Sequence, residues 1–175
     1  MNPVKYIFVD IDETLLHTEI RYGSKKEEIV LQADERAMHN WGHPYVAKLR
    51  PGAHELLRRL RAISPGNVFA LTTSTKDYAE GFTAQFEFGF APEDIFPRER
   101  LRDGPKLDLA RFPNGRAYLI DDRSEHEQYE KIRFLSGIGG ERFGVRYIRV
   151  QEFFGDDSQG FTPEELDRII DRVEN

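Results

Sequence analysis

The chain contains no cysteine. Disulfide bonds, thiolate metal sites and cysteine nucleophiles are therefore excluded, so any chemistry must use oxygen and nitrogen atoms. No apolar run approaches the roughly 20 residues of a membrane-spanning helix, and no charged-then-apolar signal pattern with a cleavage site is present. From these absences we expect a soluble, cytoplasmic protein that has no membrane partner.

Positive charge is also in short supply. The 25 lysines and arginines are outnumbered by 31 acidic residues, which gives a formal net charge of -6. Non-specific nucleic-acid binding requires a positively charged face, so we expect no general nucleic-acid binding. The 175 residues, 39% of them hydrophobic, suffice for one domain. We therefore expect residues 1–175 to form a single domain.

Apolar runs alternate with helical patterns along the chain. The predicted strands are residues 6–9, 68–71, 117–120 and 145–150. The predicted helices are residues 53–61, a helix from Lys76, and a helix that follows Thr162. This alternation predicts an α/β fold with a mostly parallel central sheet flanked by helices. The polar stretch 18–48 interrupts it early, and we predict a small insertion of β-hairpin type there.

Two carboxylates follow directly on the first predicted strand. Asp10 lies at the carboxyl end of that strand, where open α/β sheets place their ligands, and a carboxylate there can attack phosphorus. Asp12 can protonate the leaving group if the chain turns after Ile11. An Asp-x-Asp sequence after a strand is equally compatible with a turn, a helix cap or a plain cation site. The assignment therefore depends on complementary residues elsewhere.

Hydroxyl side chains follow the second predicted strand, at residues 72–75. Hydroxyls and free backbone N–H groups at the start of a helix can donate to a phosphate. Helix capping is the simpler interpretation of any one of these residues, and Thr72 is our main candidate for phosphate binding.

A lysine could complete such a site, because a fixed cation offsets the repulsion between a carboxylate nucleophile and a phosphate. Lys106 follows Gly104-Pro105 and precedes a short amphipathic segment. Isolated lysines are usually solvated, and only the order of the motifs favours Lys106 over Lys76 or Lys131.

A second acidic pair, Asp121 and Asp122, follows the third predicted strand. Hard oxygen ligands that converge from the first and third strands are typical of a Mg²⁺ site. Taken alone, Asp-Asp-Arg is more often a cap with a surface ion pair. The sequence does not show which of the two acids contacts the metal directly, although we favour Asp122.

These residues together resemble the motifs of the haloacid dehalogenase (HAD) superfamily of phosphatases. The matching positions are Asp10-Ile11-Asp12-Glu13-Thr14, Thr72, Lys106 and Asp121-Asp122. More narrowly, four segments are similar to the RNA polymerase II C-terminal-domain phosphatase branch, also called FCP/SCP-like or NLI-interacting-factor-like. They are DIDETLLHT (10–18), LRPG (49–52), LTTSTKDYA (71–79) and IDDR (120–123).

The resemblance implies a Rossmann-like HAD core and a phosphoric monoester hydrolase. It implies that Asp10 forms an aspartyl-phosphate and that Asp12 acts as general acid and then as base. It also implies Mg²⁺ held by the Asp10 carboxylate, the Asp12 backbone carbonyl, and Asp121 with Asp122. The catalytic residues so predicted are Asp10, Asp12, Thr72 and Lys106.

Phosphatases of this superfamily that act on small metabolites commonly carry a cap domain that excludes water. Residues 18–48 are too few for a large cap. Residues 78–102 contain five phenylalanines that we expect in the core and at a dimer surface: Phe82, Phe86, Phe88, Phe90 and Phe96. An open site suits a bulky substrate. We therefore predict a phosphoprotein substrate carrying phosphoserine or phosphothreonine.

The candidate substrate-binding residues are Thr73, Ser74, Tyr78, Trp41 and Arg123. Trp41 lies in an aromatic loop with His39 and His43, which we do not expect to bind metal. Small-metabolite or nucleotide-end and polynucleotide-end phosphatases share every catalytic residue and remain alternatives. A catalytically silent phosphate-binding scaffold is the alternative of another class. A signalling receiver domain is disfavoured by the order of the motifs, because there the phosphoacceptor comes mid-chain and the lysine last, whereas Lys106 precedes the final acidic pair.

Overall fold

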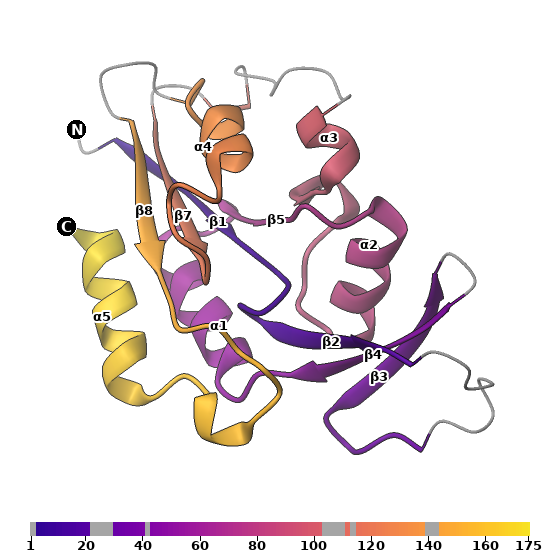
Figure 1. Ribbon diagram of the computed structural model, residues 1–175. Helices are drawn as coiled ribbons and strands as arrows, with labels where there is room; N and C mark the ends of the chain where they lie inside the picture. Colours follow the sequence, from indigo (N-terminus) through magenta and orange to yellow (C-terminus); the bar gives the residue numbers. More distant parts are fainter. Residues whose placement is uncertain (1–2, 22–29, 41–42, 103–110, 113–114, 139–143) are drawn as a thin grey trace.

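The computed structural model describes residues 3–21, 30–40, 43–102, 111–112, 115–138 and 144–175 (Figure 1). A five-stranded sheet of order β6-β5-β1-β7-β8 forms its centre, and every neighbouring pair in it is parallel. Its strands are β1 (Val4–Val9), β5 (Val68–Leu71), β6 (Ile95–Phe96), β7 (Gly115–Asp121) and β8 (Val145–Arg149). The predicted parallel α/β fold is confirmed.

Helices cover both faces of this sheet (Figure 1). The helices are α1 (Ala53–Ile63), α2 (Lys76–Gln85), α3 (Arg98–Arg102), α4 (Tyr129–Leu135) and α5 (Pro163–Glu174), with short 3₁₀ turns at Pro92–Asp94 and Asp157–Gln159. Side chains alternate along β1, as a strand requires. Ile7 and Val9 pack in the core beneath α1, α2 and α5, whereas Tyr6 and Phe8 pack in a second core with α4. Both faces of β1 are thus buried.

The register of the central strands brings the predicted site residues to one edge. Val9 of β1 pairs with Ala70 of β5 on one side and with Ile120 of β7 on the other. Asp10 and Asp121 come directly after the positions on β1 and β7, and Thr72 comes directly after β5, all at the same edge of the sheet. Asp10, Thr72 and Asp121 therefore converge, although they are distant in the sequence.

The predicted insertion is larger than a hairpin. It is a three-stranded antiparallel sheet of order β2-β4-β3, formed by β2 (Leu16–Ile20), β3 (Glu35–Asn40) and β4 (His43–Leu49). The sheet lies beside α2, where the Tyr45 and Tyr78 rings meet edge to face at 5.8 Å between centroids. Four of the five phenylalanines predicted in the core are buried, and Phe90 packs against it.

Arg50, at the end of β4, joins three loops beneath the site. Its side chain is fully buried and donates to the backbone carbonyls of Gln151 at 2.7 Å, Gln159 at 3.0 Å and Thr14 at 3.3 Å. The guanidinium also lies 3.8 Å from the centroid of the Phe161 ring. A buried cation with several carbonyl acceptors fixes those loops relative to one another.

We expect Arg50→Met to lower the free energy of unfolding by about 3 kcal/mol or more, because three hydrogen bonds to a charged group are lost and the buried carbonyl of Thr14 is left unpaired. Urea denaturation measures this change. Arg58→Met is the matched control, because Arg58 on α1 is 68% exposed and its surface ion pair contributes about 1 kcal/mol at most. Equal losses in the two variants would contradict the role given to Arg50.

Candidate active site

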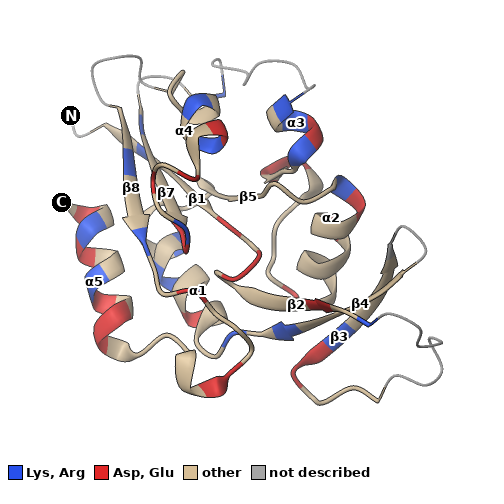
Figure 2. Ribbon diagram, in the orientation of Figure 1, with Lys and Arg blue, Asp and Glu red and all other residues tan. Residues whose placement is uncertain are grey.

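The candidate site lies at the carboxyl end of β1, between the central sheet and the small antiparallel sheet (Figure 2). Asp10, Asp121 and Asp122 are all buried there, and each places one carboxylate oxygen within 4.8 Å of the other two. Burial raises the pKa of Asp10 well above its usual range, and Lys131 partly opposes this. Burial, and then the charge of Asp121, also raise the pKa of Asp122. The three acids therefore need a compensating positive charge.

Among the described residues, the Asp122 carboxylate is hydrogen-bonded through only one of its two oxygens. Its Oδ1 accepts a hydrogen bond from the Thr14 hydroxyl at 2.9 Å, and its backbone N–H donates to the same hydroxyl at 3.1 Å. Its Oδ2 is buried and has no hydrogen-bond partner among the described residues. Burying an unpaired carboxylate oxygen is unfavourable. The atom is thus available to a hard cation such as Mg²⁺, which prefers oxygen ligands.

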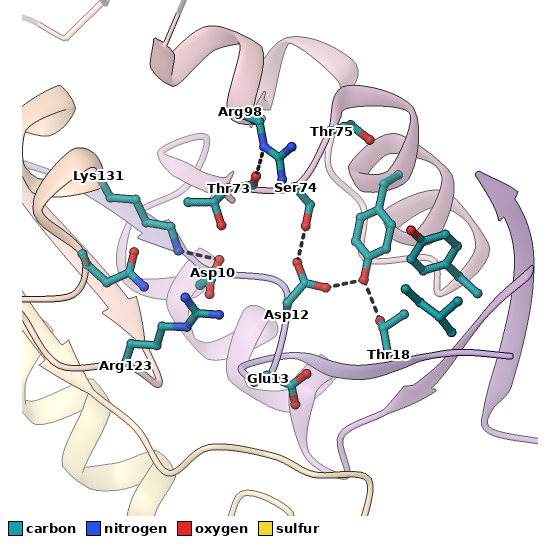
Figure 3. A pocket seen from close by; sticks show the side chains of 14 residues that line it. Asp10, Asp12, Glu13, Thr18, Thr73, Ser74, Thr75, Arg98, Arg123 and Lys131 are labelled. Carbon is teal, nitrogen blue, oxygen red and sulfur yellow. Dashed lines mark hydrogen bonds and ion pairs between the residues drawn. The ribbon is translucent and has the colours of Figure 1, made fainter. Parts of the chain in front are cut away.

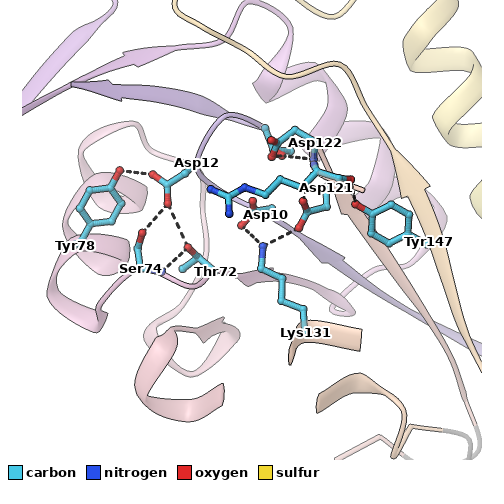
Figure 4. A network of polar contacts seen from close by, with 11 residues as sticks. Asp10, Asp12, Thr72, Ser74, Tyr78, Asp121, Asp122, Lys131 and Tyr147 are labelled. Atoms are coloured by element: carbon cyan, nitrogen blue, oxygen red, sulfur yellow. Dashed lines mark hydrogen bonds and ion pairs between the residues drawn. The ribbon is translucent and has the colours of Figure 1, made fainter. Parts of the chain in front are cut away.

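A buried lysine supplies positive charge to this cluster. Lys131 of α4 is 1% exposed, and its Nζ lies 2.7 Å from Asp10 Oδ1 and 2.7 Å from Asp121 Oδ2 (Figure 4). Lys106, the lysine predicted for the site, lies outside the described residues. Lys131 and Leu135, four residues apart, are both buried residues of α4, but no local sequence pattern distinguished Lys131 from a solvent-exposed lysine.

Asp12 leaves the line of β1 because the chain turns after it. Glu13 has a φ of 58°, in the left-handed region, and the N–H groups of Leu15 and Leu16 both donate to the Ile11 carbonyl. The condition that the sequence placed on Asp12, a turn after Ile11, is met. Figure 4 shows its carboxylate directed toward the residues that follow β5 and away from Lys131.

Hydroxyl groups hold the Asp12 carboxylate. Oδ2 accepts from Ser74 Oγ at 2.7 Å and from Thr72 Oγ1 at 3.3 Å, and Oδ1 accepts from the Tyr78 hydroxyl. The Tyr78 oxygen in turn accepts from Thr18 Oγ1 of β2 at 2.6 Å. Burial and the charge of Asp12 raise the pKa of the Tyr78 hydroxyl, so it stays protonated as a donor. The small sheet is thereby connected to Asp12.

The start of α2 offers fewer free donors than the sequence predicted. The Lys76 N–H donates to the Glu99 carboxylate at 3.1 and 3.2 Å, and the Ser74 N–H donates to Thr72 Oγ1 at 3.0 Å. Thr72 is fully buried and its hydroxyl is directed to Asp12. The structure thus associates Thr72 with the second carboxylate.

A pocket with a volume of about 490 Å³ opens beside Asp10 and Asp12. Its lining includes three cationic side chains, Arg98, Arg123 and Lys131, and three others of apolar or aromatic character, Ile20, Tyr45 and Tyr78. In Figure 3, Lys131 and Arg123 lie on one side of Asp10, and Thr18 lies beyond Asp12 on the other. Of the five predicted substrate-binding residues, Thr73, Ser74, Tyr78 and Arg123 line this pocket. Trp41 lies outside the described residues.

Residues 5–103 match the sequence family of the NLI interacting factor-like phosphatases. The chain belongs to this family. The match covers more than half of the chain and confirms the resemblance and the expected phosphoric monoester hydrolase family. It includes Asp10, Asp12 and Thr72, and it ends before Asp121 and Lys131. A search of curated protein sequences gave no match.

Two solved structures share the fold of this NLI interacting factor-like phosphatase domain. One is the fission yeast RNA polymerase II CTD phosphatase Fcp1, as an R271A variant bound to beryllium fluoride, with 17% identity and a TM-score of 0.55 over 97% of the chain. The other is Fcp1, described as an essential RNA polymerase II CTD phosphatase, with 16% identity and a TM-score of 0.55 over 97% of the chain. The chain spans about half of these structures, 50% and 48%.

Among the described residues, no helix has both the length and the apolar character required to cross a membrane.

Proposed function

We propose that the protein is a Mg²⁺-dependent phosphatase that hydrolyses phosphate monoesters through a phosphorylated Asp10. The observation that carries this proposal is the arrangement of two carboxylates with different surroundings beside one pocket. Asp10 lies with the buried acids and a lysine, whereas Asp12 lies among hydroxyls. Such a division suits one carboxylate for attack on phosphorus and the other for proton transfer.

The reaction has two displacements. In the first, an Asp10 carboxylate oxygen attacks phosphorus, the bond from phosphorus to the leaving oxygen breaks, and Asp12 gives that oxygen a proton. In the second, Asp12 takes a proton from water, the water oxygen attacks the phosphorus of the aspartyl-phosphate, and inorganic phosphate leaves. Asp10 is then a free carboxylate again. Tyr78, Ser74 and Thr72 keep the Asp12 carboxylate oriented through both displacements.

The acidic cluster fits Mg²⁺. Asp10, Asp121 and Asp122 would hold the ion through carboxylates, and the resemblance adds the backbone carbonyl of Asp12. The unpartnered Asp122 Oδ2 supports this assignment. When bound, Mg²⁺ would offset the negative charge of the acids and of the phosphate and would orient the phosphate.

A phosphoprotein segment is the substrate class that we propose. The insertion is a small three-stranded sheet, so the described residues include no large cap above the pocket. The names of the two similar structures, which are CTD phosphatases, favour a phosphorylated protein. Small metabolites and nucleotide ends remain the second candidate class, because the same catalytic residues serve them.

Three further expectations from the sequence stay proposals. They are a single domain over residues 1–175, a cytoplasmic location, and contact of Trp41 with the substrate.

Asp10→Asn is expected to abolish hydrolysis of para-nitrophenyl phosphate, since an amide cannot accept the phosphoryl group. Chelation of divalent metal should abolish turnover by the unaltered protein, and added Mg²⁺ should restore it. Steady-state kinetics measure both, with circular dichroism to verify folding. Substantial turnover by folded Asp10→Asn would refute covalent catalysis by this residue. A folded, Mg²⁺-loaded protein that hydrolyses none of the tested substrates would favour the scaffold alternative.

Tyr78→Phe is expected to lower kcat more for an alkyl phosphate than for para-nitrophenyl phosphate. The reason is that protonation of a poor leaving group contributes roughly 10²- to 10⁴-fold, and this variant loosens Asp12. Tyr45→Phe is the control, because Tyr45 lines the same pocket and no hydrogen bond of its hydroxyl is found among the described residues. Equal losses for both esters in Tyr78→Phe would indicate a structural role only.

The proposed substrate class predicts higher kcat/KM for peptides containing phosphoserine or phosphothreonine than for nucleotides and sugar phosphates. Interactions along a peptide are available in the transition state and raise this ratio. A panel of such compounds, assayed by phosphate release with Mg²⁺ present, measures the order. If a nucleotide or sugar phosphate has the highest kcat/KM, the phosphoprotein proposal is wrong and the second candidate class takes its place.

A further inference from the structure

Lys131 is the one described lysine buried among the acids, and its surroundings are unusual for an ammonium group. It is 1% exposed and contacts two carboxylates, Asp10 and Asp121, at 2.7 Å each. Both carboxylates lie within ion-pair distance of the ammonium, and both are themselves buried.

The same ammonium also borders the pocket. Lys131 lines the cavity together with Asp10 and Arg123, and Figure 3 shows its side chain reaching toward Asp10 from α4. A purely structural ion pair needs contact with its carboxylates only. Contact with both the nucleophile and the space for a phosphate is what a charge-neutralising group requires.

The topology explains how a lysine from this part of the chain arrives there. β7 pairs with β1, and α4, which follows β7, packs against the face that carries Phe8 and Leu119 through Leu135. Lys131 lies one helical turn before Leu135, on the same face of α4. Lys131 therefore follows the last acidic pair in the sequence, yet its side chain reaches the end of β1.

We propose that Lys131 is the catalytic cation of this site, in place of Lys106, which the order of motifs predicts. Its ammonium holds Asp10 for attack and binds the phosphate that Asp10 receives and releases. This inference rests on the proposed phosphatase function. In the sequence, the catalytic cation then follows the last acidic pair, whereas Lys106 precedes it.

Because the chain contains no cysteine, a single introduced cysteine can be alkylated to give two side chains that differ only in their terminal group. Lys131→Cys and Lys106→Cys are each unfolded, alkylated and refolded. With 2-bromoethylamine the thiolate displaces bromide and gives a side chain of lysine length that ends in an ammonium. With 1-bromopropane it gives a neutral side chain of the same length. The unaltered protein, taken through the same steps, controls for refolding and for modification elsewhere.

Two quantities are measured with Mg²⁺ present: kcat for para-nitrophenyl phosphate, and the Kd of inorganic phosphate by calorimetry. For Lys131→Cys, the propylated form should lose roughly 10²- to 10³-fold in kcat and bind phosphate about 10- to 100-fold more weakly, as expected for one lost charged hydrogen bond. The aminoethylated form should recover most of both losses. Both forms of Lys106→Cys should lose less in kcat and in phosphate affinity than propylated Lys131→Cys.

Propylated Lys131→Cys with unchanged kcat and phosphate Kd would overturn the inference, and so would the larger losses appearing in propylated Lys106→Cys. The two alkylated forms of Lys131→Cys are also prepared in combination with Asp121→Asn, which removes one of the acids that Lys131 neutralises. There too, the criterion is the ratio of the aminoethylated to the propylated form in kcat and in phosphate affinity. If the unaltered protein shows no turnover, the proposed function fails, while the phosphate Kd values still decide which lysine binds phosphate.

Discussion

Burial of negative charge at one edge of a parallel sheet is the constraint on which the rest of this structure depends. One carboxylate oxygen from each of Asp10, Asp121 and Asp122 lies within 4.8 Å of the other two, and all three residues are buried. Like charges at such distances cannot all persist without a cation. Lys131 offsets part of this charge, and the Thr14 hydroxyl satisfies one oxygen of Asp122. The remaining oxygen is the most direct indication of a metal.

Around this cluster, the fold divides its tasks between two sheets. The central sheet fixes the acids through the register of β1 with β5 and β7. The small sheet reaches the site through Thr18, which donates to Tyr78, which donates to Asp12. Arg50 joins the end of the small sheet to the loops that carry Thr14 and Gln151. Two successive hydrogen bonds thus connect the small sheet to the proposed proton donor.

The sequence predicted well those features that depend on local pattern. Short apolar runs ending in acids indicated β1 and β7, and the hydroxyl cluster indicated the end of β5. It did not predict the features that depend on the direction of a side chain. The Thr72 hydroxyl contacts Asp12, and phosphate binding by Thr72 stays a prediction. Free N–H groups were expected before α2, yet Glu99 occupies the one at Lys76. β6 was not among the predicted strands, because a strand of two residues is too short to show a hydrophobic periodicity.

By itself, the amino-acid sequence determined the parallel α/β fold, the two acidic pairs and their positions at strand ends, because hydrophobic periodicity and strand termination are encoded by neighbours in the chain. Only the tertiary structure decided which lysine meets Asp10 and which hydroxyls hold Asp12. These contacts join residues about 60 to 120 positions apart, and they depend on strand order and on the path of α4 across the sheet. A lysine in a short helix has the same local sequence pattern whether it faces solvent or a buried carboxylate.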